Sequence, residues 1–308
     1  MGRQSLSTTV IGIIVVTLLA AQQETIFRSD VQLVRILANV RDSSGTLVGD
    51  LPKEEFEVFD NGVKQQISVF ERQTAQPLAV SLLIDISAST AKDFAVESQS
   101  LQRFVDEFFK EGTIEDMASL YSFNDDVTLL SGFTRNARQL KSAMAKMRPE
   151  AGTSLYDALV LAAPRLKDRE GRRVMLVVTD GGDTTSKYTY NEALRKVHEA
   201  EASIFPILIQ PITNDSGRNI GGENALYTLA ASTGGRVFHA SVGPRLNKAF
   251  ADVLKALRTQ YFIGFYPKNV PLTKNPFHNL EVRVKTKELR AEARTGYYGD
   301  SLSTAKPK

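Results

Sequence analysis

Three short segments of the chain gather oxygen-bearing side chains where an apolar run ends or a helix is expected to begin. The first is Asp85-Ile86-Ser87-Ala88-Ser89, in which an acid and two hydroxyls occupy alternate positions. The second is Gly152-Thr153-Ser154, and the third is Thr179-Asp180-Gly181-Gly182-Asp183. Carboxylates and hydroxyls without histidine or cysteine suit a hard cation, Mg²⁺ before Ca²⁺. Together the three segments predict a cation site.

Two of these acids end apolar runs that are typical of buried strands. Asp85 follows the run Leu78–Ile84, and Asp180 follows residues 174–179. An apolar run bounded by polar residues indicates a strand buried on both faces, as in a parallel sheet covered by helices. Ligands of open parallel sheets bind just beyond the carboxyl ends of the strands. The acids are therefore expected at the edge where ligands bind.

Residues 78–258 alternate strand and helix patterns, which predicts an α/β fold with a doubly wound, mainly parallel sheet and helices on both faces. In such a sheet the first and fourth strands of this region are neighbours, and their carboxyl ends flank the crevice where the strand order reverses. We therefore expect Asp85 and Asp180 to face each other there, with Thr153 arriving from a third loop.

Two helices of this region have readable boundaries. After the first loop we expect a long amphipathic helix that stops at Gly112. Asn136 and Gln139 predict a capping box for a helix that extends through Met147. The apolar face of the long helix consists of Phe94, Leu101, Phe104, Val105 and Phe108.

Segments with strand patterns flank the α/β region on both sides, at residues 29–73 and 260–299. Each is marginal as an independent fold, so we predict that they pair into one discontinuous β-sandwich. Asn61-Gly62 predicts a hairpin between Phe56–Phe59 and Gln66–Phe70, because both turn positions tolerate positive φ. Residues 280–284 and 289–295 are expected to form a second hairpin, and residues 300–308 a disordered tail.

The N-terminus predicts export. Arg3 precedes the apolar segment Val10–Ala21, which is shorter than the roughly 20 residues of a membrane span and matches the apolar core of a secretory signal peptide, residues 1–21. A small-x-small cleavage site is missing, because Leu19 lies two residues before Ala21. The prediction is a periplasmic or secreted protein, and an uncleaved membrane anchor is the alternative.

Composition excludes several classes of function. The chain has 308 residues, no cysteine and a formal net charge of +3. The absence of cysteine excludes disulfides, thiolate metal sites and cysteine nucleophiles. The weak positive charge does not indicate a nucleic-acid partner.

Asp85-x-Ser87-x-Ser89, Thr153 and Asp180 together resemble the metal ion-dependent adhesion site of von Willebrand factor A-like domains. The resemblance implies a Rossmann-like fold and a divalent cation held by these five residues, Mg²⁺ first, with Mn²⁺ or Ca²⁺ as alternatives. It also implies a protein partner that presents a Glu or Asp to the ion, in adhesion or assembly, with no bond made or broken. The expected protein is thus not an enzyme.

The flanking segments resemble a bacterial exported subgroup, the VWFA-related acidobacterial type. The segments that carry this resemblance are Phe56–Gly62, Tyr261–Pro267 and Gly296-Tyr297-Tyr298. It covers nearly all of the chain that follows the signal segment.

Other interpretations stay open at this point. Asp85 and Asp180 could be acids that cap a helix or close a turn, and Ser89 or Thr90 could be a helix cap. Asp183 could either support the metal ligands or be a turn acid. His198, His239 and His278 are expected at surface or packing positions. One alternative function is a scaffold whose metal site is idle. The other is a metal-dependent hydrolase, although the Asp-x-Asp of aspartyl-phosphate phosphatases and the Gly-x-Ser-x-Gly of serine hydrolases are both missing.

Overall fold

The computed structural model describes residues 32–299 except residues 74, 90–92, 210–219 and 272. The predicted signal peptide at 1–21 and the predicted tail at 300–308 lie outside the described residues. The described residues all belong to one compact unit. In this part of the chain, no helix is both long and apolar enough to cross a membrane.

A six-stranded sheet with the order β10-β9-β8-β5-β6-β7 forms the centre of the α/β region. β7 runs antiparallel to β6, and the other neighbours are parallel. Every residue of β5 is buried, as its apolar run predicts. The strands are β5 (Leu78–Asp85), β6 (Met117–Phe123), β7 (Val127–Thr134), β8 (Arg172–Thr179), β9 (Ala202–Ile209) and β10 (Phe238–Ala240). The predicted fold class is confirmed, and β5 and β8 are neighbours as expected.

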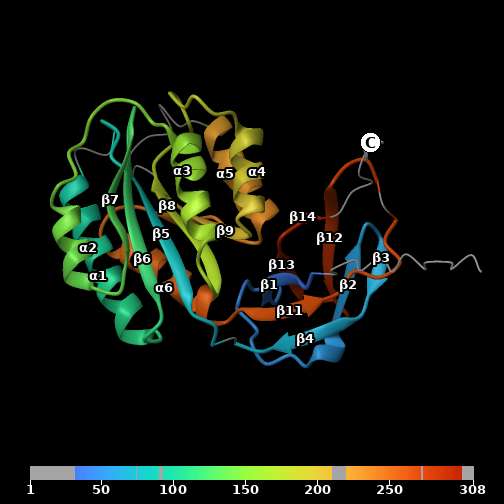
Figure 1. Cartoon of the computed structure of the whole chain (residues 1–308). Coiled ribbons are helices and arrows are strands. Elements are labelled where there is room, and N and C mark those ends of the chain that lie inside the picture. The colour runs from blue at the N-terminus through green and yellow to red at the C-terminus, as the bar shows by residue number, and fades with distance from the viewer. Residues whose placement is uncertain (1–31, 74, 90–92, 210–219, 272, 300–308) are drawn as a thin grey trace, which may run out of the picture. The chain divides into compact units, whose positions relative to one another are not determined.

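Helices cover both faces of this sheet (Figure 1). One apolar core lies between the sheet and three helices, α1 (Phe94–Glu111), α2 (Ala137–Met144) and α6 (Pro244–Arg258). A second core lies on the opposite face, under α3 (Leu155–Lys167), α4 (Tyr190–Glu199) and α5 (Ile220–Thr233). The faces of β5 are shared between them, since Leu82 packs in the first core and Leu83 in the second.

The helix caps agree with the sequence in part. The side chain of Asn136 accepts hydrogen bonds from the backbone of Arg138 and Gln139, as expected of an N-cap. The side chain of Gln139 accepts instead from Thr134, at 2.9 Å, so the capping box is only half formed. The helix also ends at Met144 and not at Met147.

Two four-stranded antiparallel sheets flank the α/β region, and each combines strands from both ends of the chain. Their orders are β13-β1-β11-β4 and β14-β12-β2-β3. Side chains of both sheets form one apolar core, which includes Ile36, Val58 and Ile263. The strands are β1 (Val34–Arg41), β2 (Phe56–Asp60), β3 (Val63–Gln65), β4 (Ile67–Glu71), β11 (Tyr261–Phe265), β12 (Phe277–Val284), β13 (Arg290–Ala293) and β14 (Gly296–Tyr298). The division of the chain into separate domains at 73/78 and 258/260 stays a prediction.

The two predicted hairpins need correction. Asn61 and Gly62 do turn the chain with φ of 47° and 80°, but the turn joins β2 only to the short β3. At Gln66 the chain leaves for the other sheet, where β4 pairs with β11. The second hairpin is wrong: β12 pairs with β2 and β14, whereas β13 pairs with β1. In both cases a distant strand supplies the better partner.

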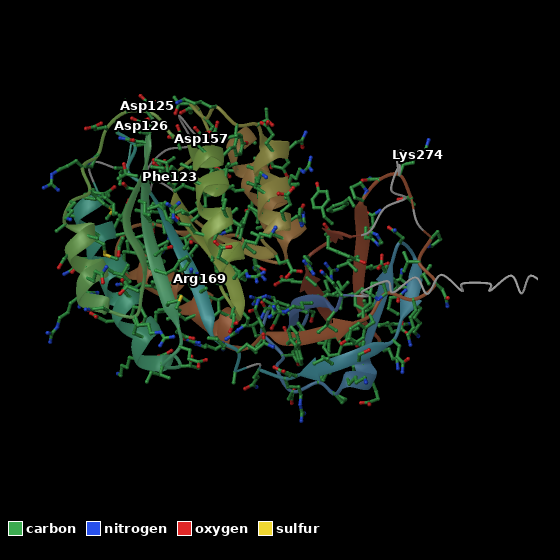
Figure 2. The ribbon with its side chains drawn as sticks, viewed as in Figure 1. Phe123, Asp125, Asp126, Asp157, Arg169 and Lys274 are labelled. Atoms are coloured by element: carbon green, nitrogen blue, oxygen red, sulfur yellow. The ribbon has the colours of Figure 1, made fainter. Side chains whose placement is uncertain are left out.

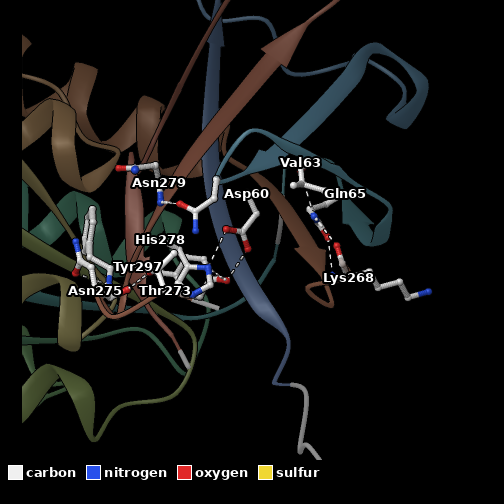
Figure 3. A network of polar contacts seen from close by, with 11 residues as sticks. Asp60, Val63, Gln65, Lys268, Thr273, Asn275, His278, Asn279 and Tyr297 are labelled. Atoms are coloured by element: carbon white, nitrogen blue, oxygen red, sulfur yellow. Dashed lines mark hydrogen bonds and ion pairs between the residues drawn. The ribbon is translucent and has the colours of Figure 1, made fainter. Parts of the chain in front are cut away.

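A buried polar network joins three strands of the second sheet (Figure 3). Asp60 of β2 accepts a hydrogen bond from the Tyr297 hydroxyl at 2.7 Å and contacts His278 Nδ1 at 2.9 Å. Asp60 is fully buried, and the other two side chains are nearly so. A buried carboxylate is stable only when its oxygens are bonded in this way, so the network fixes β2, β12 and β14 together.

Candidate metal centre

Asp85 occupies the last position of β5, and its carboxylate links the first and third oxygen-bearing loops. Its side chain is almost fully buried, with 1% of its surface exposed. Oδ1 accepts a hydrogen bond from the backbone of Ser87 at 2.8 Å, and Oδ2 accepts one from the hydroxyl of Thr179 at 2.6 Å. Thr179 ends β8, the neighbour of β5. The predicted meeting of these two strand ends is therefore observed.

The two serines of the first loop lie side by side. Ser87 Oγ and Ser89 Oγ are 2.9 Å apart, so the alternate spacing does put both hydroxyls on one side of the loop. Ser87 also forms a parallel β-bridge with Glu150, and Glu150 donates its N–H to the carbonyl of Ile86 at 3.0 Å. This bridge brings the segment before Thr153 against the first loop.

Thr153 is buried and is held by the third loop. Its backbone N–H lies 3.0 Å from Thr184 Oγ1, and its carbonyl accepts the N–H of Thr184 at 2.8 Å. The preceding Gly152 has φ of +86°, and a Cβ there would lie 1.8 Å from Asp125 Oδ1. Only glycine fits this bend. The backbone bonds of Thr153 thus go to the third loop and not to Asp85 or the serines.

Asp183 has the hydrogen bonds of a turn acid. Its carboxylate accepts the N–H of Tyr156 at 3.2 Å and a short hydrogen bond from the Ser186 hydroxyl. It therefore satisfies the first turn of α3. Asp157 of α3 makes contacts in the opposite direction. Its Oδ1 accepts the backbone N–H groups of Lys187 and Tyr188 at 2.9 and 3.0 Å. These bonds fix the start of α3, which follows the second loop, to the third loop and the residues after it.

Further acids surround this end of the sheet. Figure 2 shows Asp125, Asp126 and Asp157 together at the end of the α/β region where β6 finishes at Phe123. Asp125 and Asp126 are exposed. They belong to the turn between β6 and β7 and give this edge a negative rim.

The negative charges of the site act on one another. Burial raises the pKa of Asp85 to about 6, in spite of the hydrogen bonds from Thr179 and Ser87, and the charge of Asp180 raises it further. Burial also raises the pKa of Glu97 to about 8, with contributions from Asp180, Asp85 and Asp93. Like charges in a low-dielectric site disfavour ionisation, and a nearby cation would reverse that effect. The charge of Asp180 thus acts on both carboxyls, and the direct participation of Asp180 in a cation site stays a prediction.

Glu97 is a member of this group that the sequence analysis missed. It lies on α1, with 6% of its surface exposed. The signal was present, because positions 94, 97, 101, 104 and 108 form one helical stripe and Glu97 is its single charged member. An acid within an apolar stripe indicates a buried carboxyl with a specific environment.

The residues present fit a hard divalent cation. They supply carboxylate and hydroxyl oxygens, and the charges that raise the pKa of Asp85 and Glu97 are negative. Among the described residues, no three histidine, aspartate or glutamate side chains come together in a metal-binding group. Any cation here would thus depend on the hydroxyls of Ser87, Ser89 and Thr153. The histidines lie elsewhere: His198 is a buried packing residue, His278 belongs to the buried network with Asp60, and His239 is exposed.

Comparisons with known proteins agree with this architecture. The von Willebrand factor type A domain family matches residues 80–182, a range that contains all five predicted ligands. No curated protein matches the chain. Proximal thread matrix protein 1 from the mussel byssus superposes with a TM-score of 0.51 and 19% identity over 64% of this chain, and the match spans 49% of that protein.

Two bacterial structures are also similar. The conserved hypothetical protein BatB from Bacteroides thetaiotaomicron has a TM-score of 0.47 and 20% identity, over 58% of this chain and 98% of that one. The vWF domain of the type V pili tip protein Mfa5 from Porphyromonas gingivalis has a TM-score of 0.49 and 16% identity, over 59% of this chain and 95% of that one.

Proposed function

We propose that this chain, whose residues 80–182 match the von Willebrand factor type A domain family, is an exported protein-binding module that recognises its partner through a divalent cation. The observation that carries the proposal is the junction of three oxygen-bearing loops, closed by the 2.6 Å hydrogen bond between Thr179 and Asp85. Asp85, Ser87, Ser89, Thr153 and Asp180 would hold the cation, Mg²⁺ first and Mn²⁺ or Ca²⁺ as alternatives.

The chain's own residues prepare this site. The Ser87 N–H and the Thr179 hydroxyl fix the Asp85 carboxylate, so its orientation is set before any ligand arrives. Three of the five ligands are neutral hydroxyls and two are carboxylates, and five protein oxygens leave one position of an octahedral Mg²⁺ open. A cation held in this way supplies a positive centre that attracts one more anionic oxygen, and we assign that oxygen to a Glu or Asp of a protein partner. No residue is assigned a catalytic role.

Metal binding is tested by the thermal unfolding of the chain with Mg²⁺, with Mn²⁺ and with EDTA. We expect a rise in Tm with either metal in the wild type and no rise in Asp180→Ala. Asp126→Ala is the matched control, because Asp126 is an exposed acid of the neighbouring turn. If the wild type does not respond to either metal, or if Asp126→Ala loses the response as fully as Asp180→Ala, the assignment of the site fails.

Partner recognition needs a separate experiment. The immobilised chain is exposed to an envelope extract with Mg²⁺ or with EDTA, and Asp180→Ala serves as the second control. A partner retained only by the wild type with Mg²⁺ supports the proposal. A partner retained equally in EDTA and by Asp180→Ala would favour a scaffold whose metal site is idle.

Export is proposed from the apolar segment Val10–Ala21 behind Arg3. N-terminal sequencing of the protein recovered from periplasmic and membrane fractions tests it. A chain that begins near residue 22 in the soluble fraction supports a cleaved signal peptide, and an intact N-terminus in the membrane fraction supports an anchor.

A further inference from the structure

A small cavity lined by arginines lies far from the metal centre. Its volume is about 30 Å³, and Arg35, Arg173, Arg294, Glu201 and His198 are among its lining residues. Arg173 is the second residue of β8, whereas Asp180 follows the end of that strand. Seven residue steps of extended strand separate the two by roughly 23 Å. This arginine cavity is therefore independent of the cation site.

Arg294 carries the argument, because its donors are buried and only partly used. The side chain has 7% of its surface exposed. Nη2 donates to Glu201 Oε1 at 3.3 Å, and the guanidinium lies 5.8 Å from the centre of the Tyr297 ring. Nε and Nη1 are buried and have no hydrogen-bond partner among the described residues. A buried guanidinium with two unused donors is costly unless a ligand completes it.

The charges around the cavity are not balanced. Arg173 shares Glu201 with Arg294, through a contact of 3.3 Å between Nη1 and Oε2. Arg35 donates to neutral oxygens, Gln76 Oε1 at 3.2 Å and the carbonyl of Gly171 at 3.4 Å. Among the described residues that line the cavity, Glu201 is the one acid. Three guanidinium cations thus face a single carboxylate.

The titration behaviour of the neighbours agrees with this excess. Burial lowers the pKa of both Arg173 and Arg294, the Glu201 carboxylate opposes that effect, and the charge of Arg35 lowers both further. Burial, with a smaller contribution from Arg294, lowers the pKa of His198 to about 4. The imidazole is therefore neutral at physiological pH and adds no positive charge. The fourth arginine of the lining, Arg172, directs its donors to the carbonyls of Gln76 and Leu257.

We propose that the arginine cavity binds a small oxyanion of the phosphate class, which accepts from a free donor of Arg294, Nε or Nη1, with Arg35 and Arg173 as supporting cations. Nε and Nη1 point to different sides of the guanidinium, so they do not form one fork. A tetrahedral oxyanion at either donor has further oxygens for the neighbouring guanidinium groups, whereas a halide is a single point acceptor. The small volume excludes a nucleotide or a peptide segment. Bound phosphate would tie the strand region around β1 and β13 to the start of β8 and β9.

The test is a titration of the whole chain with sodium phosphate, with NaCl as the balance that keeps the ionic strength constant. Calorimetry is expected to show saturable binding of one anion, with a matching rise in Tm. Arg294→Met is expected to weaken phosphate binding about tenfold or more, since a charge-assisted hydrogen bond is lost. Arg290→Met, on the exposed part of the same segment, is the matched control and keeps wild-type affinity.

A second variant and a spectroscopic measurement separate binding from a structural role. Arg35 is only partly buried, so Arg35→Gln should fold even if Arg294→Met does not, and it too should weaken binding. Phosphate should raise the pKa of His198, because the anion offsets the positive charge of Arg294. Proton NMR of the imidazole measures this shift. No effect of phosphate beyond that of NaCl, or saturable binding that survives both substitutions, would overturn the proposal.

Discussion

At the scale of single residues, Glu97 is the most informative side chain near the metal centre. Its pKa is raised to about 8 from an ordinary 4.5. A carboxyl whose pKa is raised by folding keeps its proton in the folded chain at pH values where the unfolded chain has released it. Its contribution to stability is therefore complete below pH 4.5 and is lost as the pH rises through 8.

This linkage gives a prediction for the chain in EDTA. The free energy of unfolding should fall between about pH 5 and pH 8, with a slope of up to roughly 1.4 kcal/mol per pH unit from Glu97. Glu97→Gln should remove most of that slope, because the amide stays neutral. Urea unfolding at a series of pH values measures it. Glu107→Gln, an exposed position of the same helix, should leave the slope unchanged; an equal loss in both variants would contradict the assignment.

At the scale of elements, features that depend on neighbours in sequence were predicted better than features that depend on distant residues. The strands of the central sheet and the N-cap at Asn136 follow from neighbours in sequence, and both are observed. The pairing of β12 and β13 was predicted wrongly, because the true partner of β13 is β1 at the other end of the chain. A turn pattern reports only the possibility of a hairpin, and competition among distant strands decides the pairing.

The candidate site, like the strand pairing, was predicted from the sequence only in part. The acids and hydroxyls could be singled out because they follow strand ends or precede a helix, and the resemblance to the metal ion-dependent adhesion site implied the set of five ligands, which stays a prediction. The adjacency of β5 and β8, which was expected, brings Asp85 and Thr179 together. Glu97 was missed because a helical stripe was interpreted by its apolar members alone. The arginine cavity could not be predicted, since its residues come from six separate segments that only tertiary structure unites.

The network of Asp60, His278 and Tyr297 gives a prediction at this scale. Tyr297→Phe removes the hydroxyl that donates to the buried Asp60 at 2.7 Å. The variant should lose about 1–3 kcal/mol of stability, the cost of a buried acceptor left with one partner fewer. Chemical unfolding measures the loss. Tyr298→Phe, the adjacent and more exposed tyrosine, should lose less than half as much, and equal losses would show that the network is not the cause.

At the scale of the whole molecule, the C-terminal strands complete both flanking sheets. A chain that ends at Gly299 keeps every described strand, so it should unfold at the same urea concentration as the full chain. A chain that ends at Thr286 lacks β13 and β14, the partners of β1 and β12. It should unfold at a clearly lower urea concentration and bind a hydrophobic dye, because the core around Ile36 and Val58 is uncovered. Equal unfolding midpoints would contradict this role.

The union of the two chain ends also sets the order in which the protein can fold. Arg41 of β1 pairs with Glu292, which lies 251 residues later. During synthesis, β1 and β2 emerge first and wait for partners that emerge last, whereas the α/β region between them has its own two cores and strand pairs. Closing so long a loop is slow unless its interior folds first and shortens the distance. We therefore expect the α/β region to fold before its flanks, and β1 and β2 to be the last of the described strands to gain protection from hydrogen exchange.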